Sequence, residues 1–220
     1  MNTWEYHPVA VVEADDFQDR YDRNGLNYLF YWKAKFPNFK ITLFTIPEKT
    51  SKPLLDLALS TDWIQLAMHG WSHESNFECY HWSYDIASTY IDRVDAMKGF
   101  VPVFKAPGWT ITPGFNGYPA EESLPIAKDP TAVYRALKDK GYLVFDRHYN
   151  HEVALGNIVC VDDNPLIVHM HTWNMETGDK NGKNGFGQVV DIHGEPWDNN
   201  TQFYFITEAV EKGLFLPCKK

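Results

Sequence analysis

Residues 11–17 read VVEADDF, and this stretch decides between the folds open to the chain. It completes an apolar run, Val9 to Ala14, that is rich in valine and predicts a buried strand with Asp15 and Asp16 at its carboxyl end. An open sheet that binds a dinucleotide would carry a GxGxxG turn at this point. Carboxylates stand there instead, so the stretch favours an α/β barrel over an open doubly wound sheet.

Further apolar runs of strand length alternate with segments of helical spacing along the rest of the chain. Such alternation is typical of a parallel α/β architecture. We expect one catalytic domain over residues 1–220, with its core over 9–212 and a glycine-rich surface loop over 172–200. The expected strands are 9–14, 40–46, 63–68, 101–105, 142–146, 157–162 and 166–171, and the expected helices are 25–36, 53–60, 84–97, 131–140 and 201–212, the last capped by Asn200 or Thr201.

The composition limits the partners that the chain can have. Its formal net charge is −9 and it contains no basic cluster, so we expect no nucleic-acid partner. We also expect a cytoplasmic protein, because no segment has the length and hydrophobicity of a membrane span and the N-terminus lacks the regions of a signal peptide. Cys79, Cys160 and Cys218 form no CxxC pair, which predicts unpaired thiols in a reducing compartment. The sequence carries no signal for the oligomeric state.

Residues 67–74, AMHGWSHE, place His69 and His73 at the end of an apolar run. Histidines at this spacing can direct two imidazoles at one ion if the backbone turns helically after the strand. The HExxH motif of zinc proteases is excluded, because Gly70 stands where that motif has glutamate. The alternative is that the two are partly buried loop histidines that bind no metal.

Asp15 and Asp16 can supply the remaining chemistry, since both can reach the mouth of a barrel where the strand gives way to a loop. One carboxylate can then bind a metal while the other acts as a base. The alternative is that the pair only caps the next turn. A carboxylate with two imidazoles suits Zn²⁺, and also Co²⁺, Ni²⁺, Fe²⁺ or Mn²⁺, with open positions for water and substrate.

Four motifs follow one another in a recognisable order along the chain. The chain resembles the polysaccharide deacetylase (NodB homology) family, the metal-dependent carbohydrate esterases and related amide hydrolases, over residues 9–212. The four matching segments are Asp15-Asp16, His69 to His73, Lys105-Ala106-Pro107-Gly108-Trp109, and Ile167-Val168-His169.

The resemblance implies a distorted (β/α)7 barrel that removes an N-acetyl or O-acetyl group from a sugar or glycan. It implies that Asp15 is the general base and that His169 protonates the leaving group. The implied cofactor is a divalent metal ion, most simply zinc. Its implied ligands are Asp16, His69 and His73.

The chain departs from the family pattern at two positions and leaves a third role open. Lys105 stands where the family has an arginine that orients the base, and a lysine supplies charge without the bidentate fork. Gly70 replaces a serine or threonine in the metal loop. His171 competes with His169 for the role of the acid, because alternation along a strand places both on one face.

Aromatic and polar residues gather in the same strand-end segments. Flat apolar rings suit the C–H faces of a sugar, and polar groups beside them can bind its hydroxyls. A single tryptophan is, however, more often part of the core. The candidate substrate-binding residues are Pro107, Trp109, Asp146, Trp173 and Asn174.

Two other functions remain open from the sequence. Relatives of the resembled fold also open cyclic amides and ureides. In that case the metal would be the same, but the bond hydrolysed would be the C–N bond of a ring. A binding protein with a degenerate site is the second alternative, given Lys105 and Gly70.

Overall fold

The structure is a computed structural model that describes residues 9–19, 22–109, 111, 129, 131–146, 157–161, 164–172 and 197–216. The chain forms two compact units, each described here by itself. Unit 1 comprises Met1–Leu43, Ser51–Gln65 and Pro165–Phe215. Unit 2 comprises Phe44–Thr50, Leu66–Asn164 and Leu216–Lys220, so strands β2 (Ile41–Thr45) and β3 (Ile64–His69) contribute residues to both.

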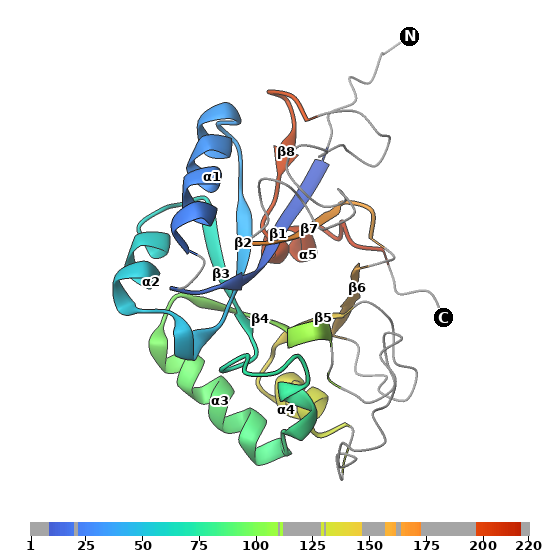
Figure 1. Ribbon diagram of the computed structural model, residues 1–220. Helices are drawn as coiled ribbons and strands as arrows, with labels where there is room; N and C mark the ends of the chain where they lie inside the picture. Colours follow the sequence, from blue (N-terminus) through green and yellow to red (C-terminus); the bar gives the residue numbers. More distant parts are fainter. Residues whose placement is uncertain are drawn as a thin grey trace. The chain divides into compact units, whose positions relative to one another are not determined.

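Unit 1 is built around strand β1, Val9–Phe17, in which Val11, Val12 and Ala14 are fully buried. Strand β1 pairs in parallel with β7 and with β8. Figure 1 shows β7 beside β1. The remaining elements are α1 (Asp22–Lys35), α2 (Lys52–Leu59), β7 (Ile167–His171), β8 (Gln202–Phe203) and α5 (Ile206–Glu211).

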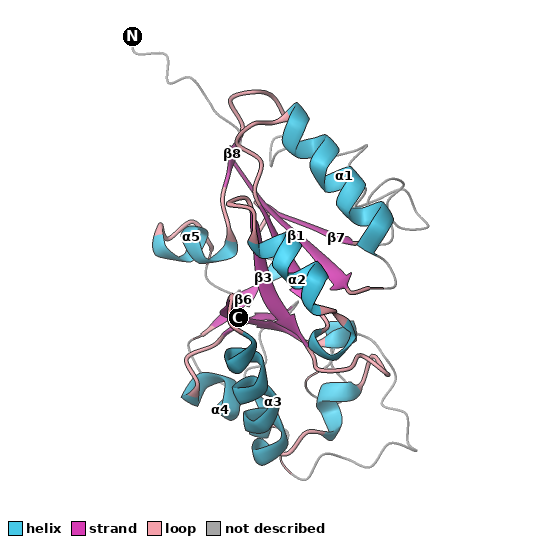
Figure 2. Cartoon of the chain, turned by 90° about the vertical axis from the view of Figure 1, so that its left-hand side faces the viewer, coloured by secondary structure: helices cyan, strands magenta, loops and turns pink. Residues whose placement is uncertain are grey.

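Unit 2 contains the parallel pairs of β3 with β4, β4 with β5, and β5 with β6. Helices α3 and α4 pack against each other, as Figure 2 shows. The elements are η1 (Pro47–Lys49), η2 (Glu78–His81), α3 (Tyr84–Met97), β4 (Phe100–Lys105), η3 (Pro107–Trp109), α4 (Ala132–Asp139), β5 (Leu143–Asp146) and β6 (Ile158–Cys160).

The strand order of the sheet is β6-β5-β4-β3-β2-β1-β7, with β8 beside β1. Each strand from β1 to β5 lies next to its successor in the sequence, and β7 returns to the side of β1. This is the order of strands in a (β/α) barrel. The chain therefore has a mixed α/β architecture with a parallel sheet in barrel order, which confirms the coarse fold expected from the alternating pattern.

One expected helix is wrong in its first half. The sequence predicts a helix over 201–212, but Gln202 and Phe203 form β8, paired with Val9 and Ala10, and α5 begins only at Ile206. The cause is packing, because the buried ring of Phe203 lies 4.8 Å from that of Trp197 and 5.3 Å from that of Phe39, measured between centroids. The Glu208 carboxylate caps the delayed helix by accepting the N–H of Phe205.

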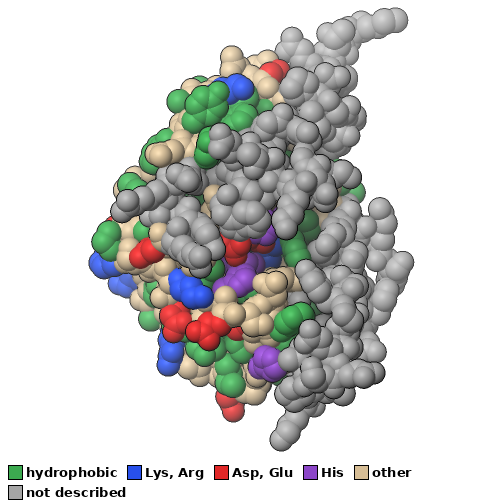
Figure 3. Space-filling model, in the orientation of Figure 1, with side chains coloured by type: hydrophobic (Ala, Val, Ile, Leu, Met, Phe, Trp, Pro, Cys, Tyr) green, Lys and Arg blue, Asp and Glu red, His purple; other side chains and the backbone are tan. Residues whose placement is uncertain are grey.

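The cysteines differ from the expectation of three unpaired thiols. Cys160, at the end of β6, is disulfide-bonded. Cys79 is free, and its burial, together with the charge of Glu78, raises the pKa of its thiol well above the usual value. No helix in the described parts of the chain is long and apolar enough to cross a membrane. Figure 3 shows acidic and basic side chains next to one another on the described part of the face that it presents.

The core of unit 2 joins buried residues of β3, β4 and β5 with those of α3 and α4, and it includes Leu137. Leu137→Ala is expected to lower the free energy of unfolding by about 2–5 kcal/mol, because it removes a completely buried side chain and leaves a cavity. Leu59→Ala is the control, since Leu59 is 42% exposed, and we expect it to cost under about 1 kcal/mol. Urea denaturation followed by circular dichroism measures both, and equal costs would contradict this packing.

Candidate active site

In unit 2, the structure brings His69 and His73 together. His69 ends β3 and is 2% exposed, and the two ring centroids lie 5.2 Å apart. Their ligand-type nitrogen atoms lie within 4.8 Å of each other. The two imidazoles therefore lie close together, as the spacing predicts, but no helical turn joins the two residues. Instead, Gly70 and His73 adopt positive φ angles of 63° and 47°, and a loop folds the second imidazole back toward the first.

Glu78 holds this loop and was missed by the sequence analysis. Its Oε1 accepts the backbone N–H groups of Trp71 and Ser72 at 3.0 Å each, and its Oε2 accepts that of His73 at 2.7 Å. A carboxylate that accepts three backbone donors fixes the loop strongly, because charge-assisted hydrogen bonds exceed neutral ones in strength. The only sequence signal was an acidic residue five positions after His73, which by itself indicates nothing.

Gly70 is required by both conformation and space. A Cβ atom added there would lie 2.7 Å from Oε2 of Glu78 and 2.7 Å from Cγ of Pro107. The structure thus explains why no hydroxyl-bearing residue stands at this position. Pro107, a candidate for substrate binding, is buried and occupies the space beside Gly70.

Gly70→Ala is expected to destabilise the protein by about 1–3 kcal/mol more than Gly141→Ala, because the added methyl group meets Glu78 and Pro107. Gly141 is the matched control: its φ is also positive, at 75°, but nothing lies within 4 Å of an added Cβ. Thermal denaturation of both variants separates the cost of the contact from that of the backbone angle. An equal loss in the two variants would show that the crowding around Gly70 is relieved cheaply.

The neighbouring strand fixes the tautomer of His69. Its Nδ1 lies 2.9 Å from the carbonyl oxygen of Lys105, the residue opposite it in the β3–β4 register. A carbonyl oxygen only accepts, so we assign the proton to Nδ1 and a lone pair to Nε2. This is the arrangement that orients histidine ligands in metal sites.

Lys105 is completely buried in unit 2 between aromatic rings. Its ammonium nitrogen lies 4.0 Å from the ring centroid of Trp109 and 4.8 Å from that of Phe44. Cation–π attraction strengthens when the cation is desolvated, so this contact fixes the ring of Trp109. Trp109, predicted to bind substrate, is only partly buried and keeps an accessible part of its side chain.

In unit 1, Asp15, His169 and His171 come together at the carboxyl ends of β1 and β7. The register places Asp15 opposite His171 and Glu13 opposite His169. The rings of His169 and His171 lie 5.0 Å apart, centroid to centroid, which confirms that alternation puts both on one face. One ligand atom from each of Asp15, His169 and His171 lies within 4.8 Å of the others.

Glu13 distinguishes His169 from His171. It is completely buried, and its Oε1 lies 2.8 Å from Nδ1 of His169. The other ring nitrogen, Nε2, lies 4.0 Å from Oδ2 of Asp15. His169 is therefore placed between two carboxylates, and the buried one orients its ring. The sequence analysis missed Glu13, although a charged residue two positions before Asp15 in an apolar strand has to share its face.

Asp16 turns the chain at the end of β1. Its φ is 66°, a conformation rare for a residue with a side chain. Its carbonyl oxygen accepts the hydroxyl of Thr172 at 3.0 Å, and the N–H of Thr172 donates to the carbonyl oxygen of Asp15 at 2.9 Å. The residue after β7 thus fixes the backbone of the aspartate pair.

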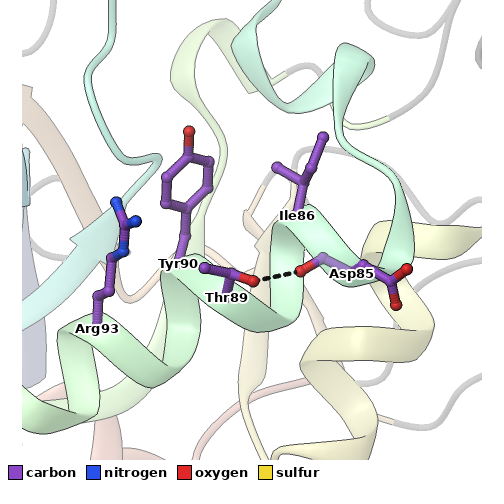
Figure 4. Close-up of a pocket in the computed structure, with 5 residues that line it drawn as sticks. All are labelled: Asp85, Ile86, Thr89, Tyr90 and Arg93. Atoms are coloured by element: carbon purple, nitrogen blue, oxygen red, sulfur yellow. Dashed lines mark hydrogen bonds between the residues drawn. The ribbon is translucent and has the colours of Figure 1, made fainter.

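Of the remaining candidates, one is described by the structure and two are not. Asp146, at the end of β5, is 3% exposed and accepts a hydrogen bond from the Tyr134 hydroxyl at 2.8 Å. Trp173 and Asn174 lie outside the described residues, as does the expected loop between 173 and 196. A shallow pocket of about 220 Å³ lies on α3 and contains none of the predicted residues (Figure 4); it is lined by Asp85, Ile86, Thr89, Tyr90 and Arg93.

Comparison with known proteins adds no assignment to this geometry. A scan against protein-family models returns no match for the chain, and a search of curated proteins finds no similar sequence.

Proposed function

We propose that the protein is a divalent-metal-dependent hydrolase that removes an acetyl group from a carbohydrate, acting on a C–N bond of an N-acetylated sugar or on an O-acetyl ester. We further propose a NodB-type (β/α)7 barrel of the polysaccharide deacetylase family. The observation that carries the proposal is the position of His169, 2.8 Å from the buried carboxylate of Glu13 and 4.0 Å from that of Asp15. A candidate acid beside a candidate base is what hydrolysis of an amide requires.

The proposed metal ligands are Asp16, His69 and His73, because one carboxylate and two imidazoles are a donor set typical of a metal site. The tautomer of His69 supports this role, because its Nε2 carries the lone pair that a metal needs. The donor set fits Zn²⁺ best and also accepts Co²⁺, Ni²⁺, Fe²⁺ or Mn²⁺. Such an ion supplies Lewis acidity, which polarises the acyl oxygen and makes water more acidic.

The side chains of the chain itself move the protons. Asp15 takes a proton from the water that attacks the acetyl carbon. His169, protonated, gives its Nε2 proton to the leaving amine nitrogen as the C–N bond breaks, so acetate and a free amine result. Glu13 accepts the Nδ1–H of His169 and stabilises the positive ring by its charge. Lys105 holds the ring of Trp109, whose accessible part is suited to a sugar face.

The test is a substrate panel with purified protein and measured metal content. Acetate release would be followed from N-acetylglucosamine oligosaccharides and from an O-acetylated sugar, and ring opening from a cyclic ureide. Zinc-dependent acetate release supports the proposal, and ring opening alone would assign the other amide chemistry. Carbohydrate binding without metal or turnover would identify a binding protein instead.

Glu13→Gln is expected to lower kcat for acetate release by about 10–100-fold. This is the usual effect of removing the carboxylate that holds the second ring nitrogen of a histidine in a functional site. Glutamine keeps the size of the side chain but removes the charge that stabilises protonated His169. The second readout is the ¹⁵N NMR shift of the His169 ring, which reports which nitrogen carries the proton. Unchanged kcat together with an unchanged ring signal would exclude a positioning role for Glu13.

A further inference from the structure

A second group of ligand-type side chains lies entirely within unit 1: Asp15, His169 and His171. We propose that these residues bind a second divalent ion of the zinc class, and that this ion inhibits the enzyme. The inhibitory consequence rests on the proposed function, because it follows from the roles of Asp15 and His169. The binding of the ion does not depend on that function.

The strand pairing brings the three donors to one place. Residues Glu13 and Asp15 on β1, and His169 and His171 on β7, face each other through a parallel register. The hydrogen bonds from Thr172 to the carbonyl oxygens of Asp15 and Asp16 fix the ends of both strands. The positions of the donors are therefore set by the sheet rather than by a loop, which reduces the cost of ordering them around an ion.

The distances are close to those of a metal site. One donor atom from each of the three residues lies within 4.8 Å of the others, and His169 Nε2 lies 4.0 Å from Asp15 Oδ2. Donors on a tetrahedral zinc ion with bonds of about 2.0–2.1 Å lie roughly 3.3 Å apart. Small side-chain rotations close this difference. One carboxylate and two imidazoles are also the donors that zinc prefers.

Glu13 orients one of the three donors, His169, through a hydrogen bond. Its buried carboxylate accepts the Nδ1–H of His169, which leaves the lone pair on Nε2, the atom on the side of Asp15. A carboxylate behind a histidine ligand fixes its tautomer and raises its basicity. The same contact that stabilises protonated His169 during turnover thus favours metal binding once the ring is neutral.

An ion held by this group would block turnover. It would occupy the carboxylate oxygen of Asp15 that accepts a proton and the Nε2 of His169 that donates one. Activity is therefore expected to rise as the first equivalent of zinc is added and to fall as the second binds.

The deciding experiment counts zinc ions bound to the metal-free protein by equilibrium dialysis and isothermal titration calorimetry. We expect two equivalents for the wild type and for the control His81→Phe, which removes an exposed histidine outside both groups. His171→Phe is expected to bind one equivalent, and so is Asp15→Asn, which keeps the shape of the side chain and serves if the first variant does not fold. His69→Ala/His73→Ala is expected to lose the other equivalent.

The outcomes separate the inference from the proposed function. If His171→Phe and Asp15→Asn both bind as much zinc as the wild type, the second site does not exist, whatever the activity. If the wild type binds one equivalent that His171→Phe loses and His69→Ala/His73→Ala retains, zinc binding by Asp15, His169 and His171 stands, and the proposed catalytic metal site fails together with the inhibition that depends on it. Loss of zinc inhibition without any change in stoichiometry would also overturn the inference.

Discussion

Replacing Asp15 by asparagine is expected to lower kcat for acetate release by about 10²–10⁴-fold, the usual contribution of a general base. Asparagine has nearly the same shape, so the 3% exposed side chain keeps its place on β1, opposite His171 of β7. It cannot accept a proton from water. We therefore expect KM to change little, because the loss concerns the chemical step and not ground-state binding.

Steady-state kinetics on N-acetylglucosamine oligosaccharides measures this effect. The matched control is Asp56→Asn on the outside of α2, where the carboxylate forms an exposed i,i+4 ion pair with Lys52. The control should stay within about twofold of the wild type, as most surface substitutions do. An Asp15→Asn enzyme that retained the activity of the control would remove Asp15 from the mechanism.

The second large effect is expected from His73→Ala. Loss of a residue that binds zinc directly should weaken zinc binding by more than roughly 10–100-fold, which is the effect of losing a residue that only forms a hydrogen bond to a ligand. Activity should fall with the bound metal, because neither water nor the acyl oxygen is then polarised. The loop itself should persist, because Glu78 binds the backbone N–H of residue 73, which alanine keeps.

Metal content after dialysis, measured by mass spectrometry, checks this prediction beside acetate release. His81→Ala provides the control, since it also removes an imidazole, but an exposed one in η2. Partial recovery of activity at high zinc concentration is expected for His73→Ala. Full metal content in the dialysed variant would contradict the assignment of His73 as a ligand.

The fold was largely predictable because its strands are buried on both faces. Runs such as Val9 to Val12 and Leu66 to Met68 are apolar, and the carboxylates and imidazoles follow toward the carboxyl ends. The C-terminal helix was misplaced for a tertiary reason. Phe203 and the apolar residues that follow it are spaced as on one face of a helix. Its ring, however, is buried against Trp197 and Phe39, and these contacts favour a strand.

The positions of the candidate site residues were predictable where the residues stand close together in the sequence. The spacing of His69 and His73, and the alternation of His169 and His171, placed each pair correctly. The two glutamates that orient these histidines were missed. Glu78 acts through backbone N–H groups, which leave no mark on the sequence, and Glu13 meets His169 only through a strand pairing over 156 positions.

Contacts in the structure explain the two positions at which the chain departs from the resembled family. Gly70 is the residue that fits, because a side chain there would collide with Glu78 and Pro107. Lys105 is buried against the rings of Trp109 and Phe44, contacts that a lysine can make as a compact charge. Neither position argues for a degenerate site.

The most direct test of the account is a crystal structure of the protein loaded with one equivalent of zinc, with anomalous data collected on both sides of the zinc absorption edge. We expect one strong anomalous peak bonded to Asp16, His69 and His73. A single peak bonded to other residues, with none at these three, would contradict it.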